Sequence, residues 1–305
     1  MTPGLRSTCA AVLALAAILP ARVGVSQEGT LTADAARNLV AAAQDGPLVV
    51  TAVAVDVAAA NVLAARPGDL ALDGLATLSP EAAAALAAHT GPLSLSGLTA
   101  LTPEVAEALG RHASILWLEG LATLAPDAAA ALAGHRGPLV LDGITVLPPR
   151  AARRLSRHAH WLSLGGLATL DPALATALAR HDGPLSLDGV VHLPAEPARE
   201  LAALRHPLSL GGVVALPAST ARALAGHRSL LAFPRLGRLT VPAAAELAHH
   251  AGPVALPALE SISYDVLFAL GSGLASEAVD GLPFTGSRSP PSPRTEVRTG
   301  PPPRP

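Results

Sequence analysis

A 23-residue repeat runs through most of the chain and constrains its fold more than any other feature. Counted from its first strand residue, the repeat reads LxLxGLxxLxPxxAxxLAxHxGP. A unit this short cannot bury its apolar face alone, so successive units must stack on one another and form a solenoid. Eight copies follow without insertion, and they begin at Leu70, Leu93, Leu116, Leu139, Leu162, Leu185, Leu208 and Leu231.

Each repeat is expected to fold as a strand, a turn and a short helix. Positions 1 and 3 are apolar, as in Leu93 and Leu95, which is the spacing of a strand with one buried face. Proline then opens a helix behind a capping residue, as in Ser79–Pro80 and Thr102–Pro103. Positions 14 and 17 are alanine and leucine in all eight copies and fall on one helical face. The pattern predicts an α/β solenoid of about ten coils, with a parallel sheet on one face and helices on the other.

The solenoid is expected to span residues 30–275, with full repeats over 70–253 and atypical capping units over 30–69 and 254–275. The ends are expected to differ from the central repeats because a terminal unit has only one neighbour to pack against.

The apolar stretch over residues 47–65 could be taken for a membrane helix, but it fits a degenerate first coil better. Leu48, Val50 and Val53 are expected to point inward from its strand, and Leu63 from its helix. The β-branched run favours a strand, and Asp56 would be costly in lipid. No transmembrane segment is therefore expected in the mature chain.

The N-terminus, residues 1–26, has the pattern of a signal peptide. Arg6 precedes an apolar segment over Cys9–Leu19, and Gly24 and Ser26 place small residues before a plausible cleavage site. The protein is therefore expected to be exported, to the periplasm, the cell surface or the outside. Cleavage would remove the single cysteine, so disulfides would not contribute to the mature fold.

The C-terminal segment, residues 285–305, is expected to be a disordered tail. Residues 286–305 hold seven prolines and four arginines with almost no apolar side chains. Such a segment cannot bury enough surface to offset the entropy lost on ordering.

The chain resembles a leucine-rich-repeat protein of the alanine-rich bacterial variety, with units such as GPLSLSGLTALTPEVAEALGRH and GPLSLDGV. The resemblance covers about residues 30–275. It implies an α/β solenoid that binds other macromolecules, and it does not imply a reaction. The usual turn asparagine is replaced by Gly-Leu, so the asparagine hydrogen-bond ladder of the common pattern is not expected.

Composition argues against several functional classes. The chain has no lysine, since all 21 basic residues are arginine, which excludes Schiff-base chemistry and a phosphate-loop lysine. Its net charge of −2 does not point to nucleic acid. Ser163, Ser186 and Ser209 follow the repeat and are interpreted as scaffold positions. No catalytic residue and no cofactor is therefore expected.

Histidine recurs at position 20 of the repeat, at the expected end of each helix. We expect a structural role, in which each imidazole satisfies backbone groups of the adjoining turn. The alternative is a metal or ligand binder that uses the aligned imidazoles. The residues are His89, His112, His135, His158, His181, His227 and His250, with Leu204 in place of the eighth.

Positions 2 and 4 are expected to point away from the core, onto an exposed, acidic sheet face. Trp117 is its large side chain, and Glu119, Asp142 and Asp188 lie on the same face. These four residues are the candidate site for a protein or an envelope polymer. The sequence thus predicts an exported, non-enzymatic binding scaffold. A purely structural repeat protein without a specific partner is a further alternative.

Overall fold

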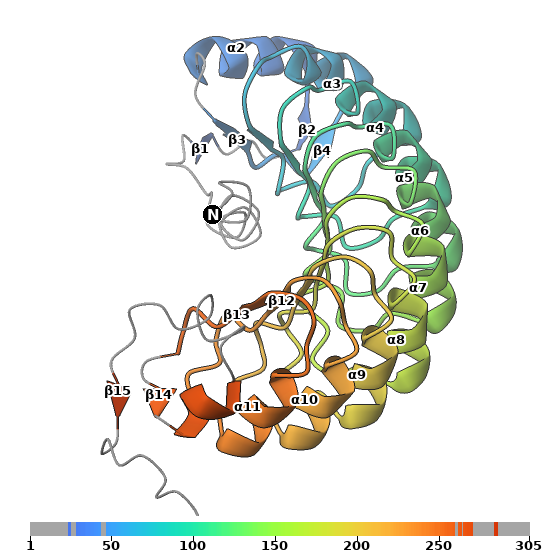
Figure 1. Cartoon of the computed structure of the whole chain (residues 1–305). Coiled ribbons are helices and arrows are strands. Elements are labelled where there is room, and N and C mark those ends of the chain that lie inside the picture. The colour runs from blue at the N-terminus through green and yellow to red at the C-terminus, as the bar shows by residue number, and fades with distance from the viewer. Residues whose placement is uncertain are drawn as a thin grey trace, which may run out of the picture.

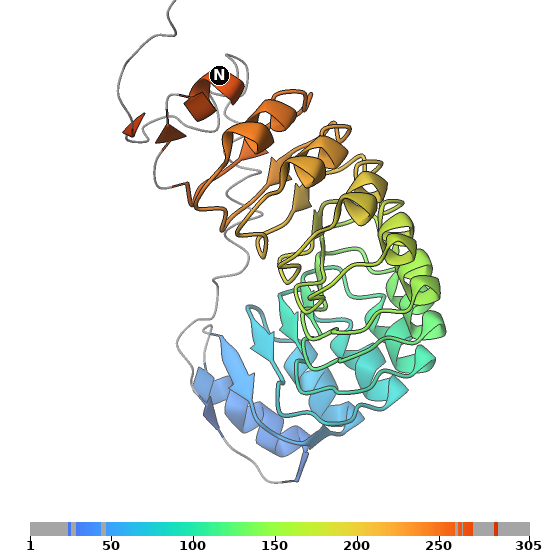
Figure 2. The same cartoon turned by 90° about the horizontal axis from the view of Figure 1, so that it is seen from below.

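The computed structural model describes residues 24–25, 29–43, 47–259, 262–263, 265–270 and 284–285. These residues form an arc of stacked strand-helix units, with the strands along the inner side and the helices along the outer side (Figure 1). The arc is also visible from below (Figure 2). Nearly all of the predicted signal peptide and of the predicted disordered tail lies outside the described residues.

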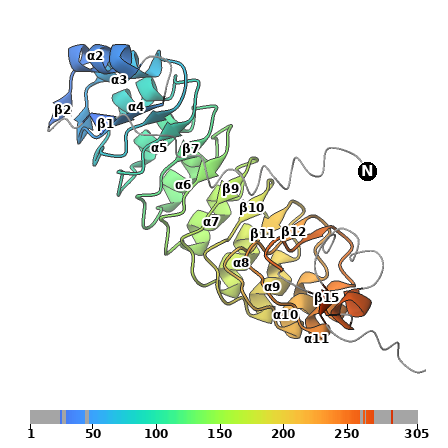
Figure 3. The ribbon, with the colours of Figure 1, turned by 90° about the vertical axis from the view of Figure 1, so that its left-hand side faces the viewer.

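The strands of the main sheet run parallel and follow the chain order from rung to rung, as Figure 3 shows from the open side of the arc. Most of them consist of two residues. Within the described residues this sheet has 11 strands: β1 (Gly24–Val25), β3 (Leu48–Val50), β5 (Leu70–Ala71), β6 (Leu93–Ser94), β7 (Leu116–Trp117), β8 (Leu139–Val140), β9 (Leu162–Ser163), β10 (Leu185–Ser186), β11 (Leu208–Ser209), β12 (Leu231–Ala232) and β13 (Val254–Ala255).

The helices pack side by side along the outer face, each against the next. After α2 with 11 residues and α3 with 8 residues, every helix of the full repeats has seven. Their bounds are α2 (Ala33–Ala43), α3 (Val57–Ala64), α4 (Pro80–Leu86), α5 (Pro103–Leu109), α6 (Pro126–Leu132), α7 (Pro149–Leu155), α8 (Pro172–Leu178), α9 (Ala195–Leu201), α10 (Ala218–Leu224) and α11 (Val241–Leu247).

Equivalent positions of neighbouring repeats lie side by side. Leu70 is paired with Leu93, and Leu93 with Leu116, so the strand register reproduces the sequence repeat. The leucine at position 17 is fully buried in each full repeat, as Leu132 is in α6. The predicted α/β solenoid is confirmed, and its core is one continuous column of leucine and alanine.

The predicted helix starts are confirmed where a capping residue precedes the proline. The side chains of Ser79, Thr102 and Asp171 each accept a hydrogen bond from the backbone N–H three residues later. These bonds satisfy one of the free N–H groups of the first turn.

Glycine at position 5 is required by the close approach of neighbouring rungs, and not by an unusual φ. A Cβ on Gly97 would lie 2.3 Å from the carbonyl oxygen of Asp73, and one on Gly143 would lie 1.7 Å from that of Glu119. A larger residue would push these turns apart, which explains the glycine in seven of the eight copies, whereas the last copy has Arg235 at this position.

The first coil follows the prediction except at one position. Leu48, Val50 and Leu63 are buried, but Val53 is 48% exposed and Ala52 is buried in its place. The expectation for Val53 was wrong because this coil has 22 residues and not 23, so the inward position after the strand falls one residue earlier, on Ala52. In the part of the chain that the structure describes, no helix is long and apolar enough to cross a bilayer.

Additional strands pair outside the main sheet near the two ends. Beside the first coil, β2 (Thr30–Leu31) pairs with β4 (Ala54–Val55), and Leu31 is fully buried. At the other end, β14 (Ile262–Ser263) pairs with β15 (Phe284–Thr285). The terminal units thus depart from the regular repeat.

Candidate functional site

The seven periodic histidines form one buried column at the ends of the helices, called here the histidine column. Each is at most 5% exposed. Neighbouring rings from His89 to His181 are stacked with centroids 5.9–6.4 Å apart and interplanar angles of 2–15°. Buried Leu204 interrupts the column, which resumes with His227 and His250 at 5.7 Å.

Most of these imidazoles link one repeat to the one before it. The Nε2–H of His158 donates to the carbonyl oxygen of Gly137 at 3.0 Å, and that of His181 donates to His160 at 3.0 Å. His89, His227 and His250 make the same contact, whereas Nε2 of His135 faces Pro138 in its own turn. A carbonyl only accepts, so Nε2 of His158, His181, His227 and His250 carries the proton, whereas His89 has a carbonyl oxygen beside each ring nitrogen, those of Ala64 and Gly68.

Burial disfavours the charged form of six of the seven imidazoles. Desolvation lowers the pKa of His135, His158 and His181 to about 4 in each case, with repulsion from neighbouring histidines adding to the effect. The pKa values of His112, His227 and His250 are lowered mainly by the same desolvation. These imidazoles are therefore neutral near pH 7.

The column geometry does not suit a shared metal ion. Two imidazole nitrogens on one zinc ion, each at about 2.0–2.1 Å, lie at most about 4.2 Å apart. Nearly parallel rings at 5.7–6.4 Å direct their lone pairs side by side instead of toward a common point. Among the described residues, no group of three or more histidine, cysteine or acidic side chains could hold an ion.

A second set of contacts links rungs on the sheet face. The Asp142 carboxylate accepts from the Ser163 hydroxyl at 2.6 Å and from the backbone N–H of Gly165 at 2.7 Å. Asp188 accepts in the same way from Ser209 and Gly211, and Asp73 accepts from Ser94 and the N–H of Ser96. Each aspartate thus reaches across to positions 2 and 4 of the next repeat.

These contacts explain why aspartate and glycine alternate at position 4 from Asp142 to Gly211, which the sequence analysis missed. A Cβ on Gly165 would lie 2.9 Å from the Asp142 carboxyl carbon, and one on Gly211 would lie 2.8 Å from that of Asp188. Aspartate at position 4 is therefore followed by serine at position 2 of the next repeat, and after Asp142 and Asp188 also by glycine at position 4. Aligning the repeats as pairs of neighbours would have revealed this signal.

The inner face is less exposed than expected. Val140, Ser163, Ser186 and Ser209 are only 2–3% exposed, so position 2 is largely buried in the central repeats. The expectation of an exposed position 2 was wrong there, because the side chains are small and aspartates of the preceding rungs fold over Ser163 and Ser209. Asp188 and Glu119 remain exposed, and Asp142 and Trp117 are partly buried.

Trp117 lies on β7, and Glu119 follows two residues later in the turn after it. Although the residue as a whole is exposed, desolvation of the carboxyl group raises the pKa of Glu119, and repulsion from Asp142 and Asp73 adds to the effect. Unlike Asp142 and Asp188, Glu119 is not held by a pair of hydrogen bonds to the next repeat. Its carboxylate interacts with Ser96 of the preceding repeat instead, so Trp117 is the member of the candidate site whose side chain makes no hydrogen bond to another described rung.

The described residues do not assemble a nucleophile with a base. The hydroxyls of Ser163 and Ser209 donate to aspartates, and the buried histidines lie at the helix ends, away from these serines. A shallow groove between the last repeats is lined by Arg235, Arg238 and apolar side chains such as Leu239.

Comparisons with known proteins do not place the chain in a family. No protein-family description matches the sequence, and no curated protein is significantly similar to it. The architecture of repeated strand-helix units on a parallel sheet remains the basis for the likeness to leucine-rich repeats.

Proposed function

We propose that the chain is an exported, non-enzymatic scaffold of the leucine-rich-repeat type that binds a protein or an envelope polymer through its inner sheet face. The observation that carries the proposal is the partly exposed side chain of Trp117 on β7, two residues before the exposed Glu119. Trp117 is a partly exposed aromatic in a position that other repeats give to small residues or valine. Partly buried aromatic side chains beside a polar rim are typical anchors of binding surfaces.

The rest of the inner face supports this choice of locus. Asp142 and Asp188 are bonded to the following rungs, so they provide a rigid, negatively charged border and are less free to reorient toward a partner. A partner would bury the Trp117 ring and offer a cationic or hydrogen-bonding group to Glu119. A rigid aromatic anchor loses little side-chain entropy on binding.

Site-specific photocrosslinking tests this proposal and can capture a partner whose identity is still open. A photoreactive phenylalanine analogue replaces Trp117 in one variant and Phe268, which is 76% exposed near the C-terminal end, in the other. We expect a discrete adduct from position 117 that disappears with Glu119→Arg, and none from position 268. Equal labelling from both positions, or no adduct from position 117, would contradict the proposed interface.

Export is tested separately, by sequencing the N-terminus of the protein recovered from each cell fraction. We expect the mature chain to begin at Gln27. Cleavage there would remove β1 and leave β3 as the edge strand of the sheet. An intact N-terminus in the cytoplasmic fraction would contradict export and leave the interface proposal to its own test.

A further inference from the structure

Five arginines form a line along the edge of the solenoid where the helices end, called here the arginine strip. Five consecutive repeats, from the one at Leu116 to the one at Leu208, each carry one arginine at position 19 or 21. All five are exposed. They are Arg136, Arg157, Arg180, Arg205 and Arg228.

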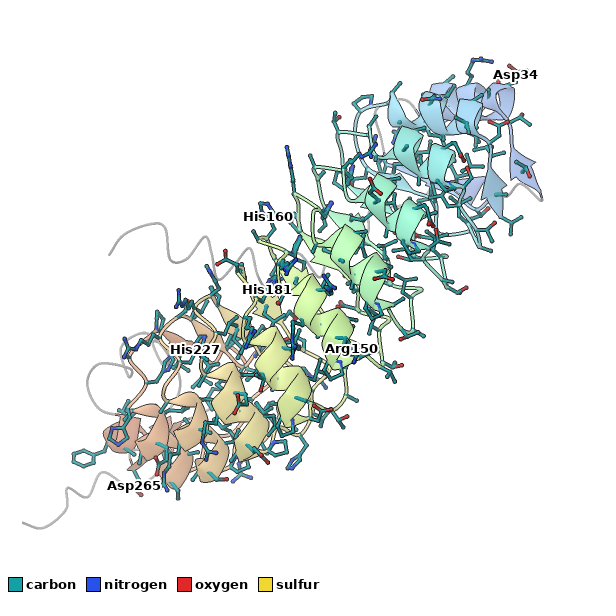
Figure 4. The ribbon with its side chains drawn as sticks, turned by 90° about the vertical axis from the view of Figure 1, so that its right-hand side faces the viewer. Asp34, Arg150, His160, His181, His227 and Asp265 are labelled. Atoms are coloured by element: carbon teal, nitrogen blue, oxygen red, sulfur yellow. The ribbon has the colours of Figure 1, made fainter. Side chains whose placement is uncertain are left out.

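The histidine column sets the spacing of this strip. Each strip arginine is the sequence neighbour of a position-20 residue, as Arg180 is of His181. Column rings of adjacent repeats lie 5.7–6.4 Å apart, so the anchors of the arginines advance by about 6 Å per rung and span roughly 24 Å. Figure 4 shows His160, His181 and His227 following this edge between the ends marked by Asp34 and Asp265.

The strip carries positive charge that the described part of the chain leaves uncompensated. None of its five arginines forms an ion pair with a described residue. Positions 19–22 of these five repeats contain one acid, Asp182, which contacts Nε2 of His206 at 3.1 Å. By contrast, Arg111 in the preceding repeat pairs with Glu107, and Arg222 on α10 pairs with Glu246.

The arrangement fits a linear polyanion that lacks bases. Guanidinium groups recognise carboxylate, sulfate and phosphate with paired hydrogen bonds. A single line of charge suits an extended chain better than a planar membrane surface. Positions 19–22 carry no Phe, Tyr or Trp in these repeats, and neighbouring Trp161 has its indole nitrogen buried. Platforms for stacking single-stranded bases are therefore missing from this edge.

We propose that the arginine strip binds an unbranched anionic polysaccharide, whose charged groups pair with arginines of successive rungs. Each of the five rungs contributes one arginine, so the strip offers one positive charge per repeat, as a repeating polymer offers one anionic group per unit. This edge is separate from the inner sheet face, so the proposal does not depend on the partner of Trp117. The two surfaces would allow the scaffold to hold a polymer at its edge and a second molecule inside its arc.

The test is calorimetric titration of the purified mature chain with dextran sulfate and with uncharged dextran of the same length. The double variant R180Q/R205Q removes two central strip arginines. The matched control R235Q/R238Q removes the same charge from exposed arginines in the turn after β12, at the opposite end of the rung. Melting of both variants checks that the fold is retained.

We expect dextran sulfate to bind and dextran not to bind. R180Q/R205Q should weaken binding about 25-fold, at about fivefold for each arginine removed. R235Q/R238Q should change the affinity less than about twofold, and affinity should fall at least about tenfold between roughly 50 and 200 mM NaCl.

Three results would overturn the proposal. The first is absence of dextran sulfate binding at low salt. The second is equal weakening by R180Q/R205Q and by R235Q/R238Q, because it would reflect net charge and not the strip. The third is tighter binding of oligo-dT than of dextran sulfate at equal charge, because it would assign the strip to nucleic acid. None of these results bears on crosslinking from position 117.

Discussion

Two polar ladders link the repeats of this solenoid, and they differ in burial and in charge. The histidine column is buried, neutral and stacked, and most of its imidazoles bond a backbone carbonyl of the preceding repeat. The aspartates at position 4 lie on the inner face, carry charge and accept from serine and a backbone N–H of the next repeat. Both ladders provide hydrogen bonds between neighbouring repeats, but only the histidine column is buried throughout.

The two ladders should therefore respond differently to solution conditions. A buried imidazole resists protonation, so the column should make stability depend on pH between the folded and unfolded pKa values. A surface carboxylate is partly solvated, so its hydrogen bonds should add little to stability. Four perturbations of decreasing expected effect test this contrast.

Acidification should have the largest effect. The unfolded pKa of histidine is about 6.5, whereas burial lowers the pKa of His135, His158 and His181 to about 4. Between these values the unfolded chain binds more protons than the folded chain. The free energy of unfolding is therefore highest above pH 6.5 and falls as the pH drops toward 4. We expect a loss of at least about 5 kcal/mol by pH 4, measured by urea denaturation at a series of pH values.

A variant that copies the natural break in the column provides the control. His158→Leu repeats the substitution present at Leu204, which is itself buried. It should make the free energy of unfolding less dependent on pH below 6.5. The pH dependence that the other histidines cause should remain. An unchanged slope would show that acid sensitivity arises elsewhere, for example from carboxylates.

Removal of a core leucine should have the second-largest effect on stability. Leu132 of α6 is fully buried and occupies the position that is leucine in every full repeat. Leu132→Ala should lower the free energy of unfolding by about 2–5 kcal/mol through lost burial and a cavity. Chemical denaturation at pH 7.5 measures the loss apart from histidine titration, and a change below about 1 kcal/mol would contradict the assigned helix face.

Loss of an inner-face carboxylate should cost less. Asp188→Ala removes the acceptor for the Ser209 hydroxyl and the Gly211 N–H, and we expect about 1 kcal/mol of destabilisation. Asp127→Ala on α6 is the control for loss of an exposed carboxylate; because Asp127 lies in the first turn of the helix, its removal should cost only about 0.3 kcal/mol. If both variants melted alike, the aspartate ladder would have no measurable role.

Metal ions should have no effect. The parallel rings of the histidine column do not converge, so zinc or nickel at pH 8 should leave the melting temperature unchanged. A column that bound metal would be stabilised by mass action, more at pH 8 than at pH 5.5, because only neutral imidazole binds. A clear rise with stoichiometric metal would reinstate the metal-binding interpretation.

Much of the fold could be predicted because the same apolar positions recur at a fixed period. Burial of position 17, the parallel register of equivalent residues and the capped helix starts all follow from local pattern and stacking. The candidate site was less accessible to prediction. Trp117 and Glu119 could be placed on one face, but whether a carboxylate is free or bonded to the next rung could not be read from its own repeat.

The repeat pattern alone was enough to define the solenoid, its rungs and the positions of its core, because periodic apolar residues have one way to share a buried face. The contacts between residues 21–23 positions apart, such as Asp142 with Ser163 and Gly165, became evident only in three dimensions. The same is true of the burial of Ala52 in place of Val53. The physical reason is that the local sequence pattern decides which side chains are buried. Which polar groups bond to each other depends on the distance between neighbouring rungs.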